Sequence, residues 1–89
     1  MEKVQVVVLY YGYLSDIIKC NNENLLVSSD FEKGIQQIKD MLEEQYALKR
    51  GSYITMINDI PLVQMQKNKL KNQLTKTDVI KIIPLISGG

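Results

Sequence analysis

Residues 28–48, "SSDFEKGIQQIKDMLEEQYAL", carry the pattern that decides the fold. Large apolar side chains recur there at steps of four, three, four and four residues: Phe31, Ile35, Ile38, Leu42 and Tyr46. This spacing places them on one stripe of a helix with about 3.6 residues per turn. Such a stripe packs against a sheet far more often than it binds a cofactor. We therefore expect one long helix lying across a sheet.

Both ends of this helix have sequence signals. Ser29 and Glu32 fit a capping box, in which each side chain bonds a free backbone N–H of the first turn. The two basic residues and the glycine at 49–51 suit a helix C-terminus. We predict that the helix begins near Asp30 and ends around Leu48.

Extended segments flank the helix. Residues 4–11, "VQVVVLYY", are almost continuously apolar, which is typical of a central strand buried on both faces. Residues 25–28 and 53–57 form shorter strands, and residues 79–83, "VIKII", form another apolar one. Between the last two, Asn58 and Asp59 can supply the positive φ angles of a tight hairpin turn that leads into a short strand.

The predicted order is strand, strand, helix, strand, short strand, strand. One long helix on a mixed sheet of four to five strands, with the first and last strands at its centre, is the β-grasp (ubiquitin-like) α+β arrangement. A ferredoxin-like domain would need a second helix of comparable quality, which the sequence lacks. We assign residues 1–83 to the β-grasp domain and residues 84–89 to a flexible C-terminal Gly-Gly tail.

Composition narrows the function. A chain of 89 residues forms one domain that is too small to enclose a deep substrate cavity. It contains no histidine and one cysteine, which excludes Ser-His and Cys-His catalysis, an internal disulfide and most zinc sites. The net charge of +1 gives no field that would attract nucleic acid or an anionic membrane. Without a secretory signal at its start, the protein is expected to be cytoplasmic and to share its chemistry with a partner.

The last residues suggest what that chemistry is. Pro84 has no amide hydrogen, and we expect it to end the pairing of the last strand. Leu85 and Ile86 then become apolar anchors for a partner groove, and Gly88 and Gly89 allow an extended backbone to enter a narrow channel. A terminal carboxylate is an unreactive anion at neutral pH. Adenylation by ATP in another protein would activate it, and a sulfur donor could then replace AMP.

The whole chain resembles the small, sulfur-carrying subunit of molybdopterin synthase, within the MoaD/ThiS group of ubiquitin-like sulfur carriers. The resemblance rests on "VQVVVLYYG" at 4–12, "MINDIPL" at 56–62 and "LTKTDVIKIIPLISGG" at 74–89. That family closes with a leucine, a turn ending in aspartate, an apolar strand, a proline and a Gly-Gly terminus. The corresponding residues here are Leu74, Asp78, Val79, Pro84, Gly88 and Gly89.

The resemblance implies roles for the tail and for several partners. Gly89 would carry the thiocarboxylate, and the partner-binding residues would be Pro84, Leu85, Ile86, Ser87 and Gly88. An E1-like (MoeB-like) adenylating enzyme would load the tail with ATP and Mg, helped by a sulfur donor system. A MoaE-like large subunit would then pass the sulfur to cyclic pyranopterin monophosphate in molybdenum cofactor biosynthesis. The chain would bind no cofactor and no metal, and would have no turnover by itself as the sulfur-donating subunit of this sulfurtransferase.

Other readings of the tail stay open. A ThiS-like carrier for thiamine thiazole or another pathway would use the same chemistry with a different acceptor enzyme. A ubiquitin-like protein modifier would form an isopeptide bond with a lysine. An interaction module would need the Gly-Gly segment only as a flexible end, which leaves Leu85 and Ile86 exposed without a reason.

Overall fold

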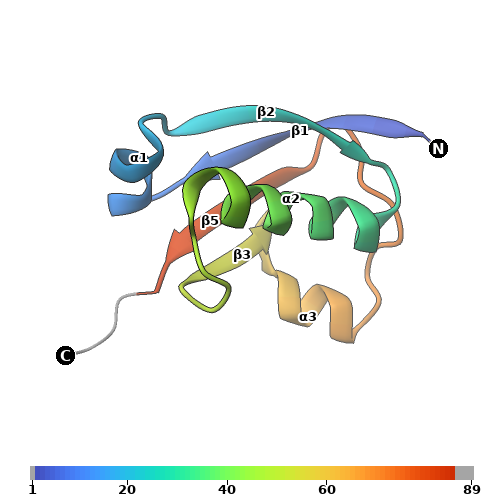
Figure 1. The fold of residues 1–89 in the computed structure, drawn as a ribbon. Helices are drawn as coiled ribbons and strands as arrows, with labels where there is room; N and C mark the ends of the chain where they lie inside the picture. The colour runs from blue at the N-terminus through green and yellow to red at the C-terminus, as the bar shows by residue number, and fades with distance from the viewer. Residues whose placement is uncertain (1, 86–89) are drawn as a thin grey trace.

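The structure is a computed structural model that describes residues 2–85. A five-stranded sheet has the order β2-β1-β5-β3-β4 and carries one long helix and two short ones (Figure 1). The elements in chain order are β1 (Lys3–Tyr10), α1 (Tyr13–Ile18), β2 (Asn22–Ser28), α2 (Phe31–Tyr46), β3 (Tyr53–Ile57), β4 (Ile60–Pro61), α3 (Leu62–Lys67) and β5 (Val79–Pro84).

The first and last strands form the centre of the sheet, as predicted. β1 pairs antiparallel with β2 and parallel with β5, with Val8 opposite Ile80. On its other side β5 pairs antiparallel with β3, and β3 pairs with the two-residue strand β4. This is the topology of the β-grasp fold, and that prediction is confirmed.

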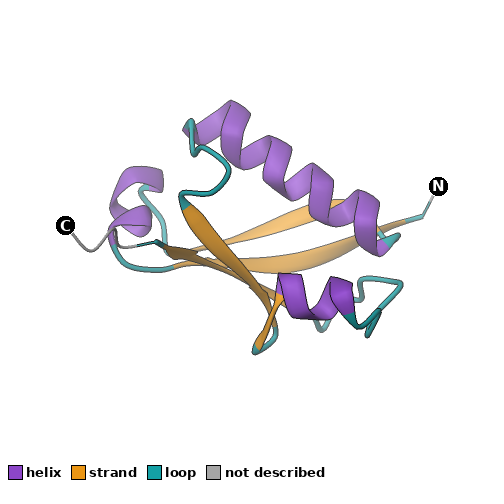
Figure 2. Ribbon diagram, turned by 90° about the horizontal axis from the view of Figure 1, so that it is seen from below, coloured by secondary structure: helices purple, strands orange, loops and turns teal. Residues whose placement is uncertain are grey.

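Helix α2 covers one face of the sheet (Figure 2). Phe31, Ile35, Ile38 and Leu42 are buried against Val6, Val8, Ile80 and Ile82 of the two central strands in a single hydrophobic core. Tyr46, the last member of the predicted stripe, is partly buried at the edge of this core. The periodicity of the sequence therefore identified the face of the helix that packs on the sheet.

The sheet is buried on one face, whereas the sequence predicted a first strand buried on both. Along β1, Val6, Val8 and Tyr10 are buried, but Val7 and Leu9 between them remain partly exposed. A continuous apolar sequence shows that a strand can be buried on both faces. The face opposite to α2 is buried only if another element packs on it. Within residues 2–85 that second face stays open.

The capping box predicted at the start of α2 is wrong. The N-cap is Asp30, whose carboxylate accepts a hydrogen bond from the Lys33 backbone N–H at 3.0 Å. Ser29 is still part of the sheet edge, because its N–H donates to the Glu2 carbonyl. At the other end Ala47, with φ 56°, takes the left-handed conformation, so the helix ends slightly earlier than predicted.

The structure adds two short helices to the predicted order; for the first of them the sequence indicated only that Leu14, Ile17 and Ile18 could form one helical turn. The six-residue helix α1 follows β1, and the six-residue helix α3 occupies the start of the polar stretch before β5. Each buries only two apolar side chains: Leu14 and Ile18 in α1, and Leu62 and Met65 in α3. A helix of less than two turns is too short to show a periodic pattern.

A polar contact ties α2 to the sheet. The Glu23 carboxylate on β2 accepts hydrogen bonds from the Tyr10 hydroxyl at 3.0 Å and from the Tyr46 hydroxyl at 3.0 Å. The two rings meet edge to face with their centroids 6.3 Å apart. Burial and the hydrogen bond to Glu23 raise the pKa of both tyrosines, so both hydroxyls keep their protons and donate at neutral pH.

Candidate functional site at the end of strand β5

Strand β5 leads directly into the predicted tail. Pro84 is its last residue and pairs with Tyr53 of β3, and the Leu85 N–H donates to the Ser52 carbonyl at 3.1 Å. The prediction that Pro84 ends the pairing is therefore wrong. Proline lacks its own donor, but the next residue supplies one, so the ladder continues past it. The first two residues of the segment assigned as a tail are held against β3.

Most of the predicted site lies outside the described residues. Ile86, Ser87, Gly88 and Gly89 belong to this part of the chain, and their roles stay predictions. Leu85 is described, and 45% of it is exposed. Its side chain is thus accessible, and its role as an apolar anchor stays a prediction.

A buried carboxylate fixes the start of β5. Asp78 is 2% exposed and accepts hydrogen bonds from the Thr75 N–H at 2.8 Å and from the Asn58 side-chain amide at 3.1 Å. The Lys71 ammonium lies 3.1 Å from the same carboxylate. Burial alone would raise the pKa of Asp78, but the three donors outweigh it and hold the pKa below its ordinary value.

The hairpin turn between β3 and β4 takes part in the same contact. Asn58 has φ 61°, as predicted for the tight turn, whereas Asp59 does not have the positive φ predicted for it. The Asn58 side-chain oxygen accepts a hydrogen bond from the Val79 N–H at 3.0 Å. Hydrogen bonds from Asn58 to Asp78 and from Val79 to Asn58 thus join the hairpin turn to the start of β5. Together they set the register in which β5 runs toward the tail.

Helix α1 and the turn that precedes it lie beside the C-terminal end of β5 (Figure 1, Figure 2). The Tyr11 N–H donates to the Ile82 carbonyl at 3.1 Å. Gly12 has φ 59°, and a Cβ there would lie 3.0 Å from the Pro84 side chain. Glycine therefore lets the turn into α1 pass closely over the proline.

Apolar side chains are exposed around this end of the sheet. We call Tyr11, Tyr13, Ile17 and Leu85 the exit cluster, and each is at least 40% exposed. Isolated exposed apolar residues are ordinary, but a group of four at one end indicates a contact surface. The sequence did not identify it, because Leu85 is far from the other three members along the chain.

The open face of the sheet is a second apolar surface. It carries Val7, Leu9, Ile54, Met56, Val79 and Ile83, which alternate with the buried residues of the same strands. Lys81 stands among them, between Leu9 and Met56 in the register, and bonds the exposed Asp59. A lysine in the middle of an apolar strand is a sequence signal that this face is not covered, and the exposed Gln5 of β1 is another.

The described part of the chain offers little chemistry of its own. Residues 2–85 contain no group of three or more His, Cys, Asp or Glu side chains placed to hold a metal ion. Over the same residues, no helix is long and apolar enough to cross a membrane.

Sequence comparisons gave no match, either with a protein-family model or with a curated protein. Solved structures do match. The small archaeal modifier protein 1 of Methanosarcina acetivorans has a TM-score of 0.70 at 18% identity, with all of both chains covered. The Haloferax volcanii HVO 2177 protein has a TM-score of 0.69 at 12% identity, covering 98% of this chain and 88% of that one.

A third similar structure comes from a complex. A chain from the complex of subunits 1 and 2 of the Helicobacter pylori molybdopterin-converting factor has a TM-score of 0.59 at 25% identity, covering 97% of this chain and all of that chain. These likenesses extend over nearly the whole length of each protein. By fold, the protein is therefore a ubiquitin-like β-grasp domain.

Proposed function

We propose that this protein is a sulfur carrier that acts as the small subunit of a molybdopterin synthase. The observation that carries the proposal is the course of β5, a central strand that brings the chain to the exit cluster immediately before the sequence "ISGG". The likeness to a molybdopterin-converting factor chain over 97% of this chain supports the choice of pathway.

The chemistry takes place at the main-chain carboxylate of Gly89. One of its oxygens attacks the α-phosphate of ATP, pyrophosphate leaves, and an acyl adenylate forms. A sulfide equivalent then attacks the carbonyl carbon, and the bond between this carbon and the AMP oxygen breaks. AMP leaves, and Gly89 now ends in a thiocarboxylate. Glycine suits this position because it has no Cβ to crowd the attacked carbon.

The partners follow from these steps. An E1-like adenylating enzyme would use ATP and Mg, and a sulfur donor system would supply the sulfide. A MoaE-like large subunit would accept the tail and transfer the sulfur to cyclic pyranopterin monophosphate. The exit cluster and the open sheet face are the apolar surfaces that these partners would cover, and all of them would meet the protein in the cytoplasm.

A protein-modifier role is the second candidate. It is favoured by the likeness to a small archaeal modifier protein, which covers all of both chains. The same adenylate would then be attacked by a lysine amine, giving an isopeptide bond in place of a thiocarboxylate. A carrier for thiamine thiazole would share the loading step and differ only in the acceptor enzyme.

Intact mass spectrometry tests the loading step. Purified protein is incubated with ATP, Mg, the cognate adenylating enzyme and sulfide, and we expect the mass increase of one oxygen replaced by sulfur. A variant without Gly89 should keep its circular dichroism spectrum and fail to load. If the full chain gains neither AMP nor sulfur, the carrier proposal is wrong.

A second incubation separates the candidates. Loaded protein is mixed with the large subunit and with cyclic pyranopterin monophosphate, and the carrier should return to its carboxylate mass as the pterin gains sulfur. In parallel, unloaded protein is incubated with ATP, Mg, the adenylating enzyme and lysine-containing proteins. Covalent adducts there, with no sulfur transfer to the pterin in the first mixture, would instead identify a modifier.

A further inference from the structure

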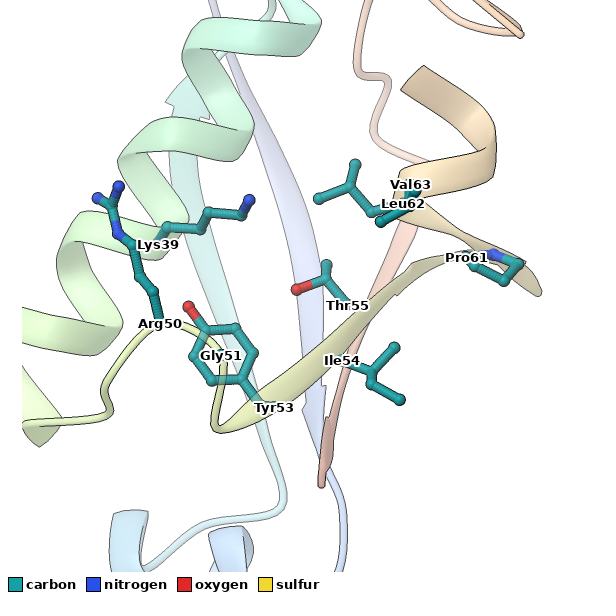
Figure 3. A pocket seen from close by; sticks show the side chains of 9 residues that line it. All are labelled: Lys39, Arg50, Gly51, Tyr53, Ile54, Thr55, Pro61, Leu62 and Val63. Atoms are coloured by element: carbon teal, nitrogen blue, oxygen red, sulfur yellow. The ribbon is translucent and has the colours of Figure 1, made fainter. Parts of the chain in front are cut away.

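A cleft that no member of the exit cluster lines lies between α2, β3 and the start of α3 (Figure 3). Its cavity volume is about 200 Å³. Apolar side chains line the side formed by β3, β4 and α3: Ile54, Pro61, Leu62 and Val63. Lys39 of α2 and Arg50 of the loop before β3 stand on the opposite side.

An unsatisfied polar group is buried in this cleft. Tyr53 is 8% exposed, and its hydroxyl has no hydrogen-bond partner among residues 2–85. Figure 3 shows the ring rising from β3 with the hydroxyl directed toward the side chains of Lys39 and Arg50. Burial raises the pKa of Tyr53, so the hydroxyl is a proton donor at neutral pH. Because a buried donor without an acceptor is unfavourable, an acceptor from outside would relieve a defect of the fold.

The charges of the cleft identify that acceptor. Arg50 is already paired with Asp40 and Glu43 on α2, whereas Lys39 has no salt bridge within the described chain. Lys39 is partly buried and extends over the cavity on the same side as the Tyr53 hydroxyl (Figure 3). An ammonium group and a hydroxyl that both donate match one carboxylate.

The size of the cavity argues for a protein occupant. Pockets for free small molecules usually enclose roughly 300–1,000 Å³ and bury most of the ligand. A volume of about 200 Å³ is closer to the space for one large apolar side chain, inserted from a segment that stays outside. The four apolar lining residues would receive that side chain, and the carboxylate would belong to its neighbour.

We propose that this cleft is a second docking site, which receives from a partner protein one apolar side chain next to a carboxylate. None of the exit cluster lines it, but Tyr53 pairs with Pro84 and Ile54 with Ile83, so the cleft adjoins the strand that leads to the tail. A segment bound there would reach the open face at Ile54.

A matched pair of peptides tests the site. Full-length ¹⁵N-labelled protein is titrated with an acetylated and amidated Gly-Leu-Asp-Gly peptide, and with the same peptide carrying Asn in place of Asp. We expect amide shifts at Lys39, at Tyr53–Thr55 and at Leu62–Val63. The Asn peptide should bind roughly tenfold more weakly, the factor that loss of a charge-assisted hydrogen bond of about 1.4 kcal/mol produces.

Two variants and a control test the named side chains. Lys39→Met and Tyr53→Phe should each lower the affinity for the Asp peptide by roughly three- to tenfold. Tyr53→Phe should leave the melting temperature unchanged or raise it, because the lost hydroxyl had no partner. Tyr46→Phe is the matched control: it removes a hydroxyl bonded to Glu23, and should lower the melting temperature without changing peptide binding.

The opposite results are equally clear. Equal binding of the Asp and Asn peptides, shifts that map to Val7, Leu9 and Lys81 of the open face, or no shift at millimolar peptide would overturn the proposal. A fall in melting temperature for Tyr53→Phe as large as that for Tyr46→Phe would show that the hydroxyl serves the fold. Hexanoate binding at the same amides more tightly than the peptide would assign the cleft to a small carboxylate and not to a partner protein.

Discussion

Replacing Asp78 by alanine should destabilise the protein strongly. The substitution removes the acceptor for the Thr75 N–H, the Asn58 amide and the Lys71 ammonium at a site that is 2% exposed. Two neutral donors at about 1 kcal/mol each and one charged donor at about 1.5 kcal/mol give a loss of about 3–4 kcal/mol. For a domain of this size each kcal/mol lowers the melting temperature by roughly 4–8 °C, so we expect a fall of at least about 12 °C.

Asp59→Ala provides the matched control, because it also breaks a Lys-Asp pair. The Asp59 side chain is 85% exposed, and a pair of this kind contributes about 0–1 kcal/mol. Urea denaturation followed by circular dichroism measures both free energies of unfolding. If Asp78→Ala costs no more than Asp59→Ala, the buried carboxylate does not hold the start of β5 and our account of that strand fails.

The same carboxylate predicts a pH dependence. Its pKa is lower in the folded than in the unfolded state, so its contribution to stability is complete above the unfolded value, near 3.8. The contribution is lost as the pH falls through the lower pKa of the folded state. Acid unfolding of the native protein should therefore steepen below about pH 4, and Asp78→Asn should remove this component. An identical acid profile for both proteins would contradict the assignment.

Three further predictions concern the helix and the exit cluster. Gly34→Ala should destabilise by about 1–3 kcal/mol in spite of alanine's better helix propensity, because the added Cβ would lie 2.5 Å from the Ser28 carbonyl oxygen; urea denaturation measures the loss. Asp30→Ala should cost about 1 kcal/mol in the same assay and Ser29→Ala much less, since only Asp30 caps the helix; the reverse order would restore the capping box. Leu85→Asp should leave the melting temperature unchanged and weaken the complex with the large subunit at least about tenfold in calorimetry, and unaltered affinity would remove Leu85 from the interface.

Sequence reasoning succeeded where a pattern spans a whole element. The stripe from Phe31 to Leu42 fixed the buried face of α2, and the apolar character of β1 and β5 placed both strands at the centre of the sheet. It failed where the outcome depends on a distant neighbour. The N-cap is Asp30, and the Ser29 backbone N–H that a capping box would have used donates instead to the Glu2 carbonyl. Local sequence does not show this contact.

The candidate sites divide in the same way. The terminal glycines and Leu85 are readable as a motif because they are contiguous. The cleft is not, because Lys39, Tyr53 and Leu62 come from three elements that meet only after folding. Pro84 also shows the limit of a residue rule: proline lacks a donor, but the Ser52 carbonyl takes its hydrogen bond from Leu85.

The parallel pairing of β1 with β5 has a consequence for synthesis of the protein. Because β1 needs β5 as a neighbour, the first strand to leave the ribosome waits for the last one before the centre of the sheet can close. A product truncated before Val79 would keep α2 but lack the strand on which Val6 and Val8 pack, so it would be left to proteolysis. Cells would therefore rarely contain a folded domain that lacks β5, the strand that leads toward Gly89.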